Sequence, residues 1–97
     1  MAASRLSVTL LSNASASGSA VEWPGGDGRV EVRGTFGGAS VSLEVLNVDA
    51  STWHTVGSDT TLTAAGTGGF KLEAGCSIRM SVTGGTPSEL YATAYRI

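Results

Sequence analysis

Apolar and polar residues alternate with a period of two along most of this chain, and this alternation predicts β-strands rather than helices. The clearest run extends from Val41 to Val45, where Ser42 and Glu44 separate three apolar residues. Such a strand buries one face and turns the other toward solvent or a neighbour. Similar runs predict about eight strands, near 5–11, 18–23, 28–34, 40–47, 52–57, 69–74, 77–83 and 89–97.

Turn-forming residues interrupt these runs at intervals of about ten residues, the spacing typical of sandwiches and small barrels. Examples are the segment from Pro24 to Gly28 and the segment from Gly84 to Pro87. No stretch of the chain carries the apolar stripe and caps of an amphipathic helix. We therefore expect an all-β fold, a small antiparallel β-sandwich or jelly-roll of about eight strands.

The chain has 97 residues, which is the size of one small domain. Its N-terminal part differs in composition, because residues 12–19 are almost all small and show no apolar period. We divide the chain into residues 1–17, an N-terminal strand or arm with a small-residue linker, and residues 18–97, the β-sandwich domain. As an arm, residues 1–11 would reach out and grip a partner without contributing to the fold.

Charge and cysteine content exclude several classes of protein. The net charge is −2 with only six Lys and Arg, so the clustered cations that nucleic-acid binding needs are not expected. No run is long and apolar enough to predict a signal peptide or a membrane span. The single cysteine, Cys76, permits no internal disulfide and no thiolate cluster for a metal, and it is expected to be a small buried hydrophobe.

No catalytic constellation is evident in the chain. His54 is the only possible histidine base; Asp49 and Asp59 bracket it, but no nucleophile motif accompanies them. Alternation in this segment predicts that Trp53 points inward and His54 outward. Asp27 lies in a Gly-Gly-Asp-Gly turn that lacks the other acidic ligands of a calcium loop. We expect neither an enzyme nor a cofactor nor a metal.

Size and edge composition predict self-association. A small domain with 14 glycines and no disulfide has a narrow margin of stability, and Lys71 is the only lysine available to guard a sheet edge. The final run, residues 90–97, carries bulky residues on both faces, so both faces need cover. The candidate interaction surface combines this run with the N-terminal segment and one tryptophan: Arg5, Leu6, Val8, Leu10, Trp23, Tyr91, Tyr95 and Ile97.

Several stretches resemble small virion proteins of tailed bacteriophages. They are Gly34-Thr-Phe-Gly-Gly-Ala-Ser-Val-Ser-Leu-Glu44, Trp53-x-x-Val56, residues 62–66, Leu72-Glu-Ala-Gly-Cys-Ser-Ile-Arg79 and residues 81–92. The resemblance covers about residues 28–97. It implies a capsid decoration, or cement, protein made in the host cytoplasm and carried on the capsid surface of the virion. Its implied partners are the major capsid protein and copies of itself, commonly as a homotrimer that stabilises capsomer junctions.

Two other functions stay open. A tail or fibre module could bind host glycan through Trp23, Tyr91 and Tyr95, because aromatic rings stack on the apolar face of a sugar. A free-standing assembly or stress factor with a sandwich fold is the third possibility. Binding to a glycan array would separate the second class from the first.

Overall fold

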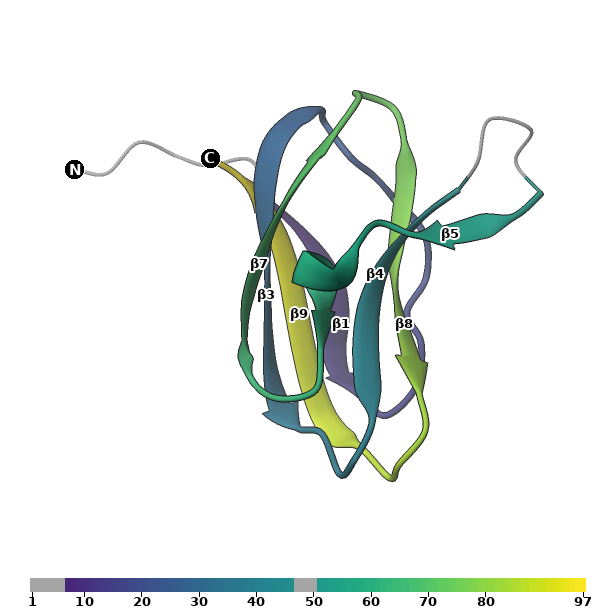
Figure 1. Cartoon of the computed structure of the whole chain (residues 1–97), viewed down its shortest axis with the longest axis vertical. Coiled ribbons are helices and arrows are strands. Elements are labelled where there is room, and N and C mark those ends of the chain that lie inside the picture. The colour runs from purple at the N-terminus through teal and green to yellow at the C-terminus, as the bar shows by residue number, and fades with distance from the viewer. Residues whose placement is uncertain (1–6, 47–50) are drawn as a thin grey trace.

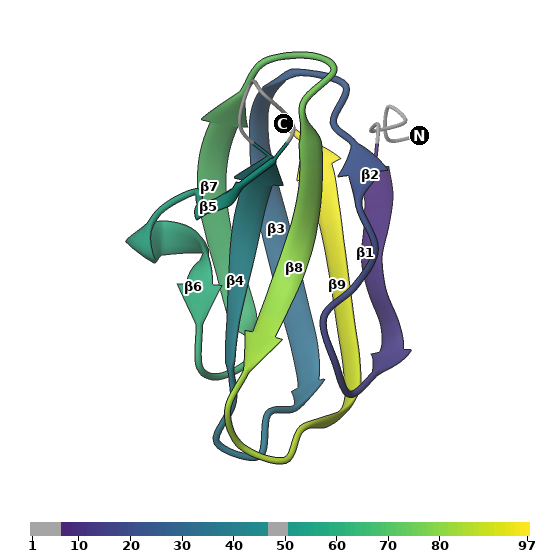
Figure 2. The same ribbon diagram turned by 90° about the vertical axis from the view of Figure 1, so that its right-hand side faces the viewer.

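The computed structural model describes residues 7–46 and 51–97 as two antiparallel sheets packed face to face (Figures 1 and 2). The first sheet contains, in spatial order, β1 (Ser7–Ala14), β9 (Ser88–Arg96), β3 (Gly26–Thr35) and β7 (Gly66–Leu72). The second contains β2 (Val21–Glu22), β8 (Ser77–Thr83), β4 (Ser40–Leu46) and β5 (Trp53–Thr55), and β6 (Thr61–Leu62) also pairs with β4. A single turn of 3-10 helix, η1, spans Ser58–Thr60. The all-β sandwich is thereby confirmed.

Two predicted strands are shorter than the pattern indicates. The segment 18–23 contributes only the two residues of β2, and 52–57 only the three of β5. Upstream of β2 the small-residue stretch runs beside β8 with isolated hydrogen bonds, such as Gly18 N–H to the Met80 carbonyl at 3.0 Å. Small side chains without an apolar period give such a segment no face to bury, so pairing stays local.

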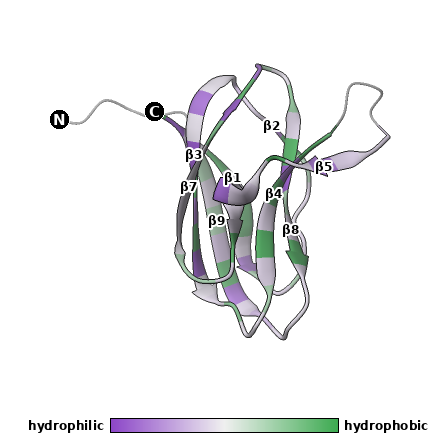
Figure 3. Ribbon diagram, viewed as in Figure 1, coloured by the Kyte–Doolittle hydropathy of each residue, from purple (hydrophilic) through white to green (hydrophobic). Residues whose placement is uncertain are grey.

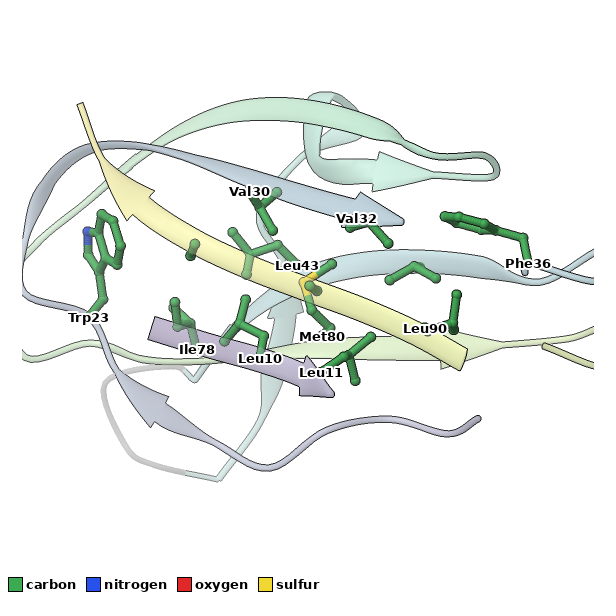
Figure 4. Packing of buried hydrophobic residues seen from close by; sticks show 13 residues of the cluster. Leu10, Leu11, Trp23, Val30, Val32, Phe36, Leu43, Ile78, Met80 and Leu90 are labelled. Carbon is green, nitrogen blue, oxygen red and sulfur yellow. The ribbon is translucent and has the colours of Figure 1, made fainter. Parts of the chain in front are cut away.

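The core lies between the sheets and draws on both of them (Figures 3 and 4). Every second residue of β3, β4, β8 and β9 enters it, as the alternation predicts. Trp23 is the largest side chain that is fully buried. The buried hydrophobic cluster consists of Leu10, Leu11, Trp23, Val30, Val32, Phe36, Val41, Leu43, Ile78, Met80, Leu90, Ala92 and Ala94.

The N-terminal segment is a structural strand in its described part. β1 pairs antiparallel with β9, and a register shift lies between Thr9 and Leu11. Such a bulge breaks the alternation, so Leu10 and Leu11 both face the core, with 4% and 3% of their surface exposed. The expectation of an arm separate from the fold is wrong for residues 7–14, because their side chains complete the core. Arg5 and Leu6 lie outside the described residues.

The glycines of β7, an edge strand of the first sheet, let η1 pack closely against that strand. A Cβ atom built on Gly68 would lie 1.8 Å from the Asp59 carbonyl oxygen, so no side chain fits there. This close approach places η1 over an edge strand (Figure 1). None of the described residues belongs to a helix that is long and apolar enough to cross a membrane.

The substitution Gly68→Ala is therefore expected to destabilise the fold by about 1–3 kcal/mol, the usual cost of overpacking. Gly66→Ala is the matched control, because a Cβ there would lie 3.9 Å from its nearest neighbours. Chemical denaturation of both variants measures the difference. Equal midpoints for the two variants would show that η1 does not pack on β7 as described.

Candidate interaction surfaces

The described residues do not gather a set of metal ligands or a catalytic cluster. No group of three or more His, Cys, Asp or Glu side chains lies close enough to hold a metal ion in 7–46 and 51–97. His54 and Asp59 are both exposed, and Asp49 lies outside the described residues. What these parts of the chain offer instead is two outer surfaces in which aromatic rings and arginines are combined.

The first surface is the solvent side of β9 and β3, which we call the tyrosine face. Register brings three pairs together across these strands: Tyr91 opposite Arg33, Thr93 opposite Glu31, and Tyr95 opposite Arg29. Directly opposite residues share one side of a sheet, and the intervening residues of both strands are buried. The tyrosine face therefore consists of Arg29, Glu31, Arg33, Tyr91, Thr93 and Tyr95.

The two arginines of the tyrosine face are held by contacts with an aromatic ring and with a residue of the neighbouring strand. The guanidinium carbon of Arg33 lies 4.3 Å from the centre of the Tyr91 ring, a cation–π contact. Arg29 donates a long hydrogen bond of 3.4 Å from Nη2 to Thr67 Oγ1 on β7. Both tyrosines are half-buried, whereas Arg29, Glu31 and Arg33 are exposed. A flat, polar-rimmed aromatic surface of this kind suits a contact with another flat surface.

The second surface, the Trp53 cluster, consists of Glu44, Leu46, Trp53 and Arg79 on the outside of the second sheet. Trp53 pairs with Leu46, and Glu44 pairs with Arg79. Arg79 covers the Trp53 ring at 4.3 Å and holds Glu44 by a bond of 2.8 Å from Nε to Oε1. The guanidinium group of Arg79 thus contacts a carboxylate and an aromatic ring at the same time. These contacts hold the first residue of β5, Trp53, against the outside of the second sheet.

This arrangement corrects the expected orientation of Trp53. Alternation within 52–57 alone places Trp53 inward, but its partner Leu46 lies on the solvent side of β4. Trp53 is half-buried by Arg79 and not by the core. The expected outward orientation of His54 is also wrong, because His54 lies opposite Val45, which faces the core side of the second sheet. His54 is nevertheless exposed, because β5 lies at the outer end of this sheet and little packs against it (Figure 1).

The residues proposed from the sequence separate into buried and exposed groups. Leu10 and Trp23 are core residues, 4% and 0% exposed, so their assignment to an interaction surface is wrong. Val8 is half-buried and packs against the core. Tyr91 and Tyr95 come together on the tyrosine face.

Ile97 is the large hydrophobic residue with the greatest exposure among the described residues, at 70%. Its N–H donates to the Asp27 carbonyl at 3.1 Å, so the pairing of β9 with β3 continues to this residue. Asp27 and Ile97 therefore extend the tyrosine face at one end. This position keeps Ile97 as a candidate contact residue.

The residues that lie beside Tyr91 and Tyr95 were not predicted from the sequence. The alternation in 28–34 places Arg29, Glu31 and Arg33 on one solvent face, so that part of the surface was available from periodicity. Periodicity does not show that β9 is the neighbour of β3, since many residues separate the two strands in the chain. For the same reason the contact between Trp53 and Arg79 had no local signal.

Comparisons with known proteins do not identify a family. No protein-family model matches the chain, and no curated protein or solved structure is significantly similar to it. The likeness to bacteriophage virion proteins therefore remains an expectation from the sequence. What the molecule itself offers toward a function is the two surfaces described above.

Proposed function

We propose that this chain is a structural protein of a tailed-bacteriophage virion, a head decoration protein that docks on the capsid shell and stabilises capsomer junctions. The observation that carries the proposal is the Trp53 cluster, an aromatic–arginine surface on an edge strand that lies outside the body of the sandwich (Figure 1). Trp and Arg are the residues that most often dominate protein–protein contacts.

The edge position of β5 adds a second means of contact. β5 is the last strand of the second sheet, and among the described residues only one of its edges is paired, with β4. An unpaired strand edge accepts a strand from another protein, and backbone hydrogen bonds then supply affinity while neighbouring side chains supply specificity. We infer that the shell protein contacts the open edge of β5 and the exposed part of Trp53.

The variant Trp53→Ala tests this docking surface. It is expected to weaken binding to undecorated particles by a factor of about 30 or more, the effect of losing a hot spot of about 2 kcal/mol. Co-sedimentation measures it, with recombinant chain and purified heads of the phage whose genome encodes the sequence. His54→Ala is the matched control, because His54 is exposed on the same strand. Equal occupancy by both variants would contradict this role of Trp53.

Glycan binding by a tail or fibre module is the alternative, and the tyrosine face favours it. Tyr91 and Tyr95 lie on one side of β9, four residues apart, and offer two rings beside arginine and threonine. Trp23 cannot take part, since it is fully buried. A glycan array with wild type and Tyr95→Ala separates the two functions. If wild type binds a glycan with a dissociation constant of millimolar or lower and Tyr95→Ala does not, the result would support glycan binding over capsid decoration as the function.

A further inference from the structure

The outward residues of β3 carry alternating charges that form no ion pair with any other residue in the described part of the chain. They are Asp27, Arg29, Glu31 and Arg33, all exposed. Within 7–46 and 51–97 the ion pair that forms is Arg79–Glu44, on the opposite side of the sandwich. Four ordered charges of alternating sign on one rigid strand form a fixed pattern that another surface can match.

This pattern is complementary to itself under a two-fold rotation. Consider an axis in the plane between two such faces, perpendicular to the strands and level with Val30. The rotation places Arg29 over Glu31 of the second copy and Asp27 over Arg33 of the second copy. Each contact then occurs twice, as in any two-fold interface, and all four contacts join opposite charges. With the sheets in this antiparallel register, no like charges of β3 lie directly opposite one another.

We propose that two copies of this chain associate face to face through the tyrosine face. This two-fold register is set by the charges of β3 and is independent of the virion role. The uncharged neighbours fit the same register, because Ile97 lies level with Asp27 and Tyr91 lies level with Arg33. Ile97 therefore meets Tyr91 of the second copy, which covers the hydrophobic side chain that is 70% exposed in a single copy.

The middle of the tyrosine face also accepts this register. Tyr95 lies level with Arg29 and Thr93 level with Glu31, so Tyr95 of each copy meets the smaller Thr93 of the other copy. Small side chains stand at both margins beside the centre of the face, where Ser7 pairs with Tyr95 and Gly69 with Arg29. Toward one end of the face the long side chain of Lys71 lies opposite Asp27. Large and small residues thus lie opposite one another across the interface, which close packing of two sheets requires.

The area of the face indicates a weak, salt-sensitive dimer. The sheet has four strands. At a spacing of about 4.8 Å and about 3.3 Å per residue, its face covers roughly 450 Å² per copy. The total, roughly 900 Å², lies below the about 1,200 Å² at which stable specific interfaces begin, so a weak, transient association is expected. Added salt should weaken it, because its register depends on solvent-facing charges.

Charge exchange at two positions tests the register. Glu31→Arg leaves arginines at both central positions, and Arg29→Glu leaves glutamates at both, so each variant alone opposes like charges in the proposed contact. Mixed together, the two variants restore both opposite-charge contacts. Sedimentation equilibrium between 5 and 500 µM should show wild type as a monomer–dimer equilibrium, each variant weakened at least tenfold, and the mixture restored to wild-type affinity. Circular dichroism checks that the variants fold, as exposed substitutions normally allow.

Three outcomes would overturn the proposal: a wild type that stays monomeric at 500 µM, variants that associate as well as wild type, or a mixture that is not restored. A wild-type trimer near 29.4 kDa, three times the 9.8 kDa of the chain, would also overturn it. That mass is the one the resemblance to decoration proteins implies, whereas the two-fold contact predicts about 19.6 kDa. Binding of the monomeric variants to phage heads is a separate readout, so failure of the dimer and failure of the capsid role are distinguishable.

Discussion

Replacement of Trp23 by alanine is expected to remove the largest share of this protein's stability that any single substitution can remove, about 3–5 kcal/mol of the free energy of unfolding. The side chain is fully buried, and its ring centre lies 4.8 Å from that of Phe70. The backbone of Gly28 approaches the indole so closely that a Cβ there would lie 2.6 Å from it. Removing the indole leaves a cavity that this backbone cannot fill, at a cost of about 3–5 kcal/mol. Small domains have only about 5–15 kcal/mol in total, and this chain is among the smaller ones.

Urea denaturation followed by circular dichroism measures this loss. Trp53→Ala is the matched control, because it removes the same side chain from a half-buried surface position and is expected to cost about 1 kcal/mol. The contrast tests the assignment of Trp23 to the core and of Trp53 to the surface. Similar losses in the two variants, or a stable Trp23→Ala protein, would contradict that assignment.

Deletion of residues 1–14 is the second change with a large expected effect, and it should abolish folding. It removes β1, whose pairing with β9 covers one edge of the first sheet. It also removes Leu10 and Leu11, each of which is nearly fully buried in the core. Full burial of such a side chain stabilises a fold by about 1.5–3 kcal/mol, so the loss of both costs about 3–6 kcal/mol, which is comparable with the whole stability of a small domain near the lower end of about 5–15 kcal/mol. The loss of the strand pairing with β9 adds to this cost.

Deletion of residues 1–6 is the control, because it keeps all of the described strand β1, Ser7–Ala14. This shorter deletion is expected to leave the melting temperature within a few degrees of that of the full chain. Measurements of solubility and thermal melting on the two truncated proteins test whether β1 is needed for folding. A folded, cooperative protein lacking residues 1–14 would restore the idea of an N-terminal arm that is separate from the sandwich.

The sequence was sufficient to place the long strands and to predict which side of the regular ones is buried. In β3, Val30 and Val32 alternate with charged residues, and the structure buries the valines and exposes the charges. Local alternation suffices there because the strand is regular and one face is buried. It failed at Leu10 and Leu11, where a bulge turns two consecutive residues toward the core.

The position of Trp23 could not be predicted from its local sequence. It precedes Pro24 and a run of glycines, a context typical of an exposed loop. Two backbone hydrogen bonds tie it to a distant turn, from Trp23 N–H to the Cys76 carbonyl at 2.8 Å and from Gly75 N–H to the Trp23 carbonyl at 2.9 Å. Those bonds fold the loop over one end of the core, and only the tertiary structure shows this.

The tyrosine face, like the position of Trp23, could not be predicted from local sequence. Its tyrosines and its charges were each visible in the sequence, but on strands separated by most of the chain. Their juxtaposition follows from the strand order β1-β9-β3-β7, in which the last strand lies between the first and the third. Local periodicity carries no information about the order of strands in a sheet, so the tyrosine face could be recognised only in the structure.

The most direct test of the virion proposal is to locate the protein in purified particles. The proposal requires a phage whose genome encodes the sequence; antibody raised against the recombinant chain would be applied, with gold labelling, to density-purified virions of that phage. The proposal predicts label distributed over the head, and intact virions that yield peptides of this chain in many copies. Label on the tail or fibres would support the glycan-binding alternative. Purified virions that contain no peptide of this chain would contradict a structural role in the particle.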